Sequence, residues 1–178
     1  MTLRLFASLH IPEDIAEPLL ERMHDLDGAN WRPPEALHIT LRFFGEVAET
    51  VADDLDAELS TITSPPLALH LHEVGSFGEG HRIDTLWAGV GESEPLRHLA
   101  ARCETAARRA GLKPETRNYK PHVTLAYLNR ANPAQVAAWI QANNLLKSDV
   151  FAVDRFGLYS SHLTSEGSRY RLEKAYRF

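Results

Sequence analysis

Two short motifs in the sequence combine side chains suited to proton transfer and anion binding. In each, one apolar residue separates a histidine from a threonine, and leucine follows: His38-Ile39-Thr40-Leu41 and His122-Val123-Thr124-Leu125. Residues two apart on a strand point to the same face. The histidine and threonine of each motif therefore share one polar face, and the apolar pair packs on the other.

Two imidazoles across a shared space can act as general acid and general base near neutral pH. One takes a proton from an attacking water while the other gives a proton to a departing oxygen. Two threonine hydroxyls can hold the oxygens of a tetrahedral anion, and neutralising charge that builds on phosphorus is the electrostatic part of catalysis. The pair of motifs predicts phosphoryl transfer without a metal or cofactor, especially the opening of a small cyclic phosphodiester.

A third His-x-Thr segment, His162-Leu163-Thr164, lies in a polar stretch without an apolar residue after the threonine. Such short matches arise readily by chance. We interpret this one as part of a turn.

Hydrophobic periodicity predicts alternating strands and helices. The expected strands are 2–9, 38–44, 67–74, 82–90, 121–128, 149–160 and 169–178, and the expected helices are 12–26, 49–62, 93–110 and 133–143. The two motifs are 84 residues apart, and the helices after them begin at about the same offset. This predicts an internal duplication within a single domain 1–178, with approximate repeats 1–80 and 81–178. Duplicated units tend to pack around a pseudo-two-fold axis, which brings equivalent positions together.

The composition is that of a globular protein: 178 residues, 44% hydrophobic and 24% charged. The single cysteine, Cys103, excludes a disulfide within the chain and a cysteine-based zinc cluster, and we expect it to be a buried thiol. A net charge of -5 argues against non-specific coating of nucleic acid. No stretch is typical of a signal peptide or membrane span. We therefore expect a cytoplasmic protein with no membrane partner.

Several segments together resemble the 2H phosphoesterase superfamily, and within it the RNA 2',3'-cyclic phosphodiesterases, also known as 2'-5' RNA ligases. The resemblance covers essentially the whole chain: Arg4–Ala7, the first signature His38–Glu46, Leu86–Val90, the second signature Lys120–Ala126, Leu158–Ser161 and Arg169–Tyr170. It implies a bilobal α/β (α+β) fold with two antiparallel sheets facing a central cleft and helices outside.

The resemblance also implies an activity and site roles. The expected reaction converts a 2',3'-cyclic phosphate, on an RNA end or a nucleotide, to a 2'-phosphate without a metal or cofactor. By this resemblance His38 is the acid for the 3' oxygen and His122 is the base for water. Thr40 and Thr124 hold the phosphate. Phe43 matches an aromatic position that stacks on the terminal base, although packing in the core is its other interpretation.

One position departs from the family pattern. The second signature commonly has an arginine that helps to hold the phosphate, and Tyr127 stands at that position. Phosphate binding then passes to the Tyr127 hydroxyl, or to Arg130, Arg42 or Lys120. A tyrosine hydroxyl is one neutral donor where arginine offers a charged fork.

Three other functions stay open on the sequence alone. The same residues could join RNA ends by the reverse reaction, with a 2'-5' linkage. The chain could also bind RNA ends or nucleotides with little catalysis, which the tyrosine at position 127 favours. A metal-dependent phosphoesterase is the remaining alternative. Two lobes that already cover each other favour a monomer.

Overall fold

The hydrophobic alternation of the sequence builds ten strands and four helices in the computed structural model, which describes residues 1–178. The strands are β1 (Thr2–His10), β2 (Ala29–Trp31), β3 (His38–Ala48), β4 (Leu67–Leu69), β5 (Leu71–Phe77), β6 (Thr85–Val90), β7 (His122–Leu128), β8 (Phe151–Val153), β9 (Arg155–Thr164) and β10 (Gly167–Arg177). The helices are α1 (Glu13–Leu20), α2 (Glu49–Leu59), α3 (Glu94–Arg109) and α4 (Pro133–Asn143), with short 3-10 turns η1 (Pro34–Ala36) and η2 (Gly80–Arg82).

Most expected elements are present, with differences at their ends. Helix α1 stops at Leu20 rather than at residue 26, because the amides of Arg22 and Met23 bond to carbonyls three residues back and Asp25 has a left-handed backbone, φ 60°. The expected strands 67–74 and 149–160 are each split in two. Strand β2 was not expected, and His162–Thr164 belongs to β9 rather than to a turn.

The sheet is antiparallel at every strand pair and continuous, in the order β10-β9-β1-β3-β7-β6-β5, with β2 paired to β7. Its two halves meet between β3 and β7 through a single residue pair, Ile39 with Val123. The α/β fold is confirmed, and the two expected sheets are joined at this pair into one. Strands β4 and β8 form a separate two-stranded sheet.

Two residue pairs between strands repeat the spacing of the two motifs. Ile39 pairs with Val123, and Ala68 in β4 pairs with Ala152 in β8. Both pairs join residues 84 positions apart, which is the spacing of the two motifs. Two equivalent residues of a duplicated chain can face each other in this way only on the symmetry axis. Both pairs therefore lie where the expected duplication would place its axis.

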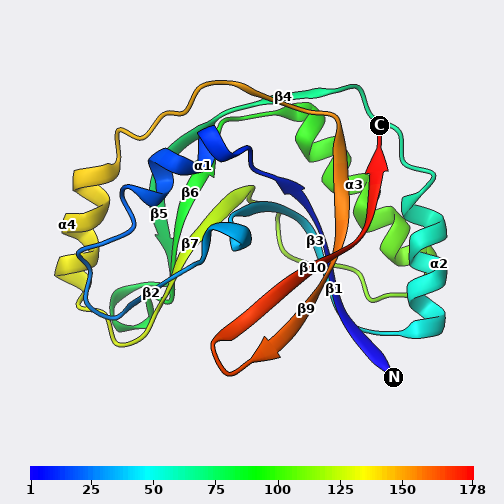
Figure 1. The fold of residues 1–178 in the computed structure, drawn as a ribbon, viewed down its shortest axis with the longest axis horizontal. Helices are drawn as coiled ribbons and strands as arrows, with labels where there is room; N and C mark the ends of the chain where they lie inside the picture. Colours follow the sequence, from blue (N-terminus) through cyan, green and yellow to red (C-terminus); the bar gives the residue numbers. More distant parts are fainter.

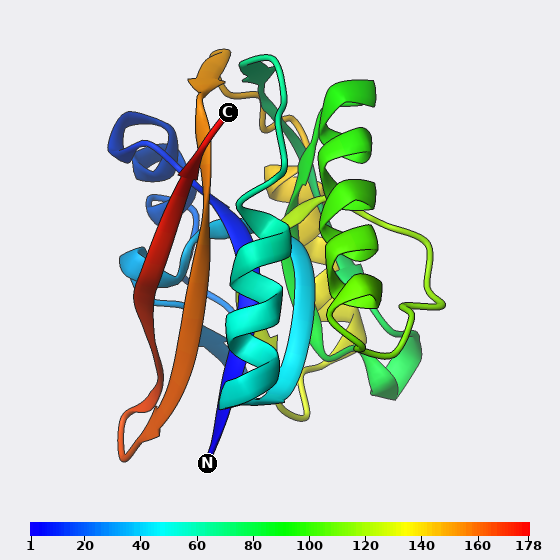
Figure 2. The ribbon, with the colours of Figure 1, turned by 90° about the vertical axis from the view of Figure 1, so that its right-hand side faces the viewer.

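Each half of the sheet uses strands from both sequence repeats. One half contains β1, β3, β9 and β10, and α2 and α3 pack on it; the other contains β2, β5, β6 and β7, with α4 beside β5 (Figure 1). Helix α3 follows β6 along the chain but lies beside α2 and β3 (Figure 2). The buried apolar residues form one cluster across both halves. The two repeats are thus interlocked, and neither half is a contiguous segment.

Candidate functional site

The two motifs meet where the halves of the sheet join. Ile39 and Val123 are paired and fully buried, so they define the covered face of β3 and β7 at this point. The histidines and threonines beside them occupy the opposite, partly open face. His122 is close enough for its charge to affect the pKa of His38. The structure therefore brings together all four motif side chains.

A β-bulge follows each threonine at the same place in both halves. Thr40 pairs with Ser8, but the next pair along is Arg42 with Ala7. In the other half Thr124 pairs with Trp87, and the next pair is Ala126 with Leu86. A bulge inserts one extra residue and redirects the side chains beyond it. In both motifs the leucine is the inserted residue, so position i+5 from the histidine shares the histidine's face.

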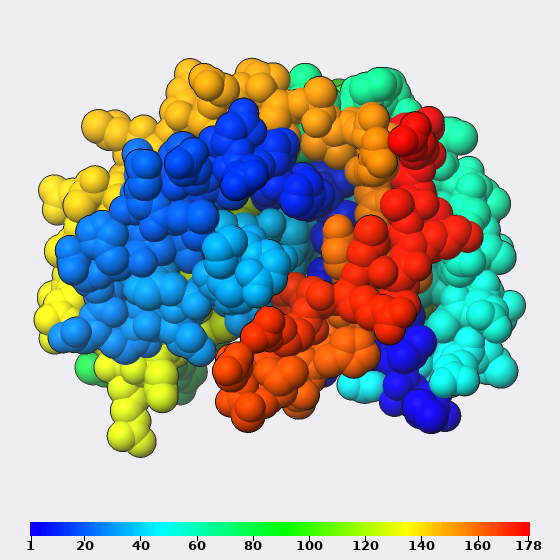
Figure 3. All heavy atoms as spheres, viewed as in Figure 1, coloured from blue at the N-terminus to red at the C-terminus, as the bar shows by residue number.

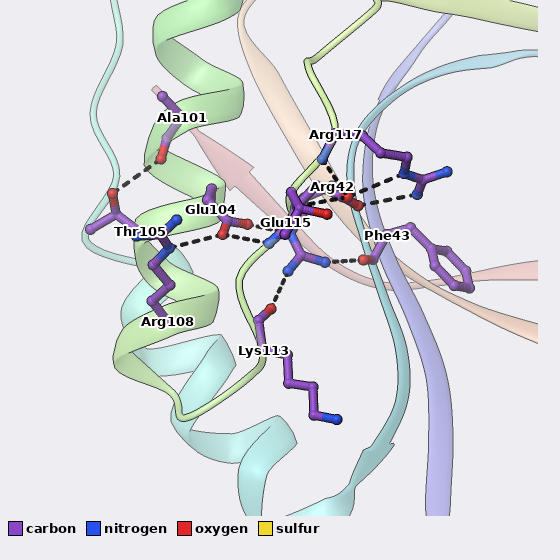
Figure 4. Close-up of polar contacts among 10 residues, drawn as sticks. Arg42, Phe43, Ala101, Glu104, Thr105, Arg108, Lys113, Glu115 and Arg117 are labelled. Atoms are coloured by element: carbon purple, nitrogen blue, oxygen red, sulfur yellow. Dashed lines mark hydrogen bonds and ion pairs between the residues drawn. The ribbon is translucent and has the colours of Figure 1, made fainter.

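The redirection separates Arg42 from Phe43. Arg42 is paired with the buried Ala7 and points to the helix-covered face, where its guanidinium bonds to Glu104 of α3 and to the carbonyls of Phe43 and Lys113 (Figure 4). Its side chain is only 10% exposed. Phe43 points away from this cluster in the same view. The structure therefore does not bring Arg42, one of the expected phosphate contacts, to the histidines. Instead, Arg42 links β3 to α3.

His38 lies against aromatic rings that limit its hydration. Its ring stacks on Phe6 at 5.0 Å and meets Tyr170 edge-on at 5.4 Å. Burial is the main cause that lowers the pKa of His38 to about 4, and the charges of Arg32 and His122 lower it further. A hydrogen bond to the Ala36 carbonyl opposes this. His38 is therefore neutral at pH 7 in the free protein.

His122 has a similar but less charged environment. Its ring meets Phe77 edge-on at 4.9 Å. Burial lowers its pKa, while a hydrogen bond to the Lys120 carbonyl, 2.6 Å from Nδ1, acts in the opposite direction. A carbonyl only accepts hydrogen bonds, so Nδ1 carries the hydrogen and Nε2 is the free basic nitrogen. The backbone thus fixes the tautomer of this imidazole.

Tyr119 links the two motifs directly. It lies just before β7, and its hydroxyl donates a 2.8 Å hydrogen bond to the carbonyl of Thr40 on β3. Its phenol is half-buried, and burial raises its pKa. The bond fixes the segment that carries His122 against the strand that carries His38. We therefore expect the distance between the two imidazoles to depend on Tyr119 as well as on the sheet.

Two exposed aromatic side chains flank the motifs at equivalent positions of the duplication. Phe43 is 40% exposed and Tyr127 is 47% exposed, and they are 84 residues apart. A guanidinium lies over each ring: Arg4 is 4.9 Å from the centroid of Phe43, and Arg32 is 5.3 Å from that of Tyr127. The exposure of Phe43 rules out the alternative that it packs in the core.

Arg32 is a further candidate for the site, which the sequence did not identify. It follows β2, and its backbone amide bonds to the Leu125 carbonyl of β7. Its guanidinium donates a 3.0 Å hydrogen bond to the Tyr170 hydroxyl of β10 (Figure 3 shows these segments in contact). Arg32 has no carboxylate partner. No sequence signal pointed to it, because the short strand β2 carries little periodicity.

The remaining candidates lie farther from the histidines. Lys120 is exposed, and the structure assigns it only the carbonyl contact with His122. Arg130 lies in the turn after β7 with a left-handed backbone, φ 53°, and its side chain is exposed without a partner. Neither side chain contacts the motif residues in this structure.

Two buried polar atoms next to the threonines lack hydrogen-bond partners: Ser8 Oγ and Trp87 Nε1. Ser8 pairs with Thr40 and Trp87 pairs with Thr124, so the two atoms belong to equivalent positions. An unsatisfied buried polar group costs about 1–3 kcal/mol, and native structures contain few of them. Both unpaired polar atoms thus belong to residues that pair with the two threonines.

The helices of this structure are all too short or too polar to span a membrane. A sequence profile described as the 2'-5' RNA ligase superfamily matches residues 11–164. Among curated proteins, the chain is 30% identical over 172 residues to the RNA 2',3'-cyclic phosphodiesterase of Archaeoglobus fulgidus, covering 95% of this chain and 97% of that protein. It is 34% identical over 140 residues to the protein of the same name from Aeropyrum pernix, covering 77% and 79%.

Solved structures match the fold over nearly its whole length. The crystal structure of E. coli LigT complexed with 3'-AMP has a TM-score of 0.82 at 24% identity, covering 100% of this chain and 99% of that chain. The crystal structure of TT0787 of Thermus thermophilus has a TM-score of 0.81 at 23% identity, covering 98% and 97%. These likenesses establish the fold, and the profile match over most of the chain establishes the family. The chain belongs to the 2'-5' RNA ligase superfamily, in agreement with the resemblance drawn from its two motifs.

Proposed function

We propose that this protein is an RNA 2',3'-cyclic phosphodiesterase that opens a terminal cyclic phosphate to a 2'-phosphate. The observation that carries the proposal is the meeting of two equivalent His–Thr pairs on one open sheet face, at the pseudo-two-fold axis. Curated relatives named for this activity support it. The proposed substrates are RNA ends or nucleotides that carry a 2',3'-cyclic phosphate.

In the proposed reaction, water attacks phosphorus while one imidazole takes its proton. The bond from phosphorus to the 3' oxygen breaks, and the other imidazole gives that oxygen a proton. The product is a 2'-phosphate monoester with a free 3' hydroxyl. The hydroxyls of Thr40 and Thr124 hold the non-bridging oxygens, where negative charge builds up. These steps need no metal or cofactor, because the chain supplies its own acid, base and anion contacts.

The protonation states bear on which histidine does which task. In the free protein burial keeps both imidazoles neutral at pH 7, and the charge of Arg32 further opposes protonation of His38. This favours His38 as base and His122 as acid, the reverse of the roles that the resemblance implies. The bound phosphate sets the final states, because its negative charge raises the pKa of the nearer imidazole.

The first experiment measures turnover of an oligoribonucleotide that ends in a 2',3'-cyclic phosphate, in the presence of EDTA. We expect conversion to a 2'-phosphate, with a loss of about a hundredfold or more in His38→Ala and in His122→Ala. His162→Ala is the matched control, because His162 belongs to the third His-x-Thr segment and its side chain forms a hydrogen bond with Ser160 rather than with a motif residue. Full activity in both motif variants would overturn the proposal, and loss of activity in EDTA would indicate a metal enzyme.

A second substrate separates the acid from the base. Bis(4-nitrophenyl) phosphate has a leaving group that needs no proton, so a variant that lacks the acid keeps more of its activity on this compound than one that lacks the base. If His122→Ala retains the larger fraction of wild-type activity on this compound, His122 is the acid. If His38→Ala retains the larger fraction, His38 is the acid, as the resemblance implies.

A further inference from the structure

Tyr127, Arg32 and Tyr170 form a cluster that the proposed chemistry does not use. We propose that this cluster is a subsite for a second nucleotide, on the 5' side of the terminal cyclic phosphate: Tyr127 stacks on its base and Arg32 binds the phosphate that joins the two nucleotides. The inference rests on the proposed function and specifies its substrate class. It predicts that the protein favours RNA chains over mononucleotides.

The cluster lies on one side of the point where the two His–Thr pairs meet, and Phe43 lies on the other. Phe43 and Tyr127 are equivalent residues, so they lie on opposite sides of the axis where the two His–Thr pairs meet. They are the only aromatic side chains among the exposed large apolar residues. A phosphate bound on the axis therefore has an aromatic ring on each flank.

The shape of a terminal nucleotide matches this arrangement. In a ribose 2',3'-cyclic phosphate, the base leaves from C1' and the RNA chain leaves from C4', on either side of the ring oxygen. The cyclic phosphate lies on the opposite edge of the sugar. With the phosphate on the axis, the terminal base and the preceding nucleotide diverge to opposite flanks. Phe43 serves the terminal base, and Tyr127 serves the preceding nucleotide.

The charges around the two rings differ in a way that favours this assignment. Arg4, over Phe43, has Glu46 as an ion-pair partner at 3.9 Å. Arg32, over Tyr127, is partly buried, has no carboxylate partner, and is held by the Tyr170 hydroxyl at 3.0 Å. A partly buried guanidinium without a counter-ion is suited to bind an anion, and arginine matches the geometry of phosphate.

Arg32 also lies to one side of the reacting centre. After burial, its charge is the next cause that lowers the pKa of His38, whereas burial and the Lys120 carbonyl account for the pKa shift of His122. The contacts of Arg32 are with Tyr127 and Tyr170, beside His38. A phosphate between the two His–Thr pairs would be held by the four motif side chains. The position of Arg32 suits the next phosphate along the chain.

The experiment compares kcat/KM for a dinucleotide that ends in a 2',3'-cyclic phosphate with kcat/KM for the matching cyclic mononucleotide. Stacking of one base on an aromatic ring corresponds to about 5- to 150-fold in affinity. We expect Tyr127→Ala to lower the ratio of kcat/KM for the dinucleotide to kcat/KM for the mononucleotide by a factor in this range. Tyr127→Phe keeps the ring, and we expect it to retain most of this ratio. Phe43→Ala is the matched control: it lowers both rates and leaves the ratio near that of the wild type. An unchanged ratio in Tyr127→Ala overturns the second base site.

A neutral linkage tests the role of Arg32. Replacing the internucleotide phosphate by a methylphosphonate removes its charge, and we expect wild-type kcat/KM to fall about tenfold or more, as for a lost charge-assisted hydrogen bond. In Arg32→Gln the same replacement should have little further effect. A full additional loss in Arg32→Gln would show that Arg32 does not bind this phosphate. The proposed function is judged separately, by whether the wild type turns over the cyclic mononucleotide at all.

Discussion

The low pKa of His38 makes the stability of the protein depend on pH in a predictable way. Burial, Arg32 and His122 lower this pKa to about 4 in the folded protein, against an ordinary value of about 6.5. Between these two values the unfolded chain binds more protons than the folded chain. The stability contributed by neutral His38 is therefore complete above about pH 6.5 and is lost as the pH falls from about 6.5 to about 4.

The size of the effect follows from the pKa difference. One pKa unit corresponds to about 1.4 kcal/mol, so the shift of His38 gives a total of about 3 kcal/mol. We expect the free energy of unfolding to decrease by about 2 kcal/mol between pH 7 and pH 5, and by about 3 kcal/mol between pH 7 and pH 4. His122, whose pKa is also lowered, adds a contribution in the same direction.

Urea unfolding at pH 7 and pH 5 measures this contribution when wild type is compared with His38→Gln. The glutamine cannot be protonated, so the other titrating groups cancel in the difference between the two proteins. We expect the wild type to lose about 2 kcal/mol more than the variant over this range. Equal losses in the two proteins would refute the reasoning. If His38→Gln does not fold, an NMR titration of the His38 ring in the wild type decides the matter, and a midpoint near pH 6.5 refutes it.

Two further predictions concern residues that position the motif strands. Arg42→Met removes the guanidinium that joins Glu104 to β3. We expect the free energy of unfolding in urea to decrease by about 2 kcal/mol, because a mostly buried ion pair is broken. A drop in kcat/KM with unchanged stability would instead make Arg42 a substrate contact. Tyr119→Phe removes the hydrogen bond to the Thr40 carbonyl, and we expect kcat to fall several-fold with KM little changed, because small displacements of reacting groups reduce the rate. An unchanged kcat would show that the sheet alone sets the spacing of the histidines.

The sequence by itself identified most of the secondary structure and proposed four central site residues. His38, Thr40, His122 and Thr124 could be proposed as a group because a strand fixes the face of each side chain by a two-residue period. The duplication could be found because the same short pattern recurs 84 residues later. The expected duplication, in turn, predicted that equivalent positions of the two repeats come together.

Other features depended on contacts between distant segments. The bulge after each threonine reverses the strand alternation, and it decides that Phe43 faces the histidines while Arg42 faces α3. The sequence treated both as candidates for the substrate, because a regular strand period carries no sign of a bulge. The bulge is produced by pairing with β1, 32 to 35 residues away along the chain.

The cluster around Arg32 is the clearest case of a feature decided by tertiary structure. Arg32, Tyr127 and Tyr170 come from three separate parts of the chain, and β2 brings the first beside the second by pairing with β7. No local pattern marks such a group, since each residue taken alone is typical of a polar surface. Sequence periodicity determined the strands and the faces of the motif residues. Only the packing of the interlocked repeats decided which charge and which aromatic rings surround them.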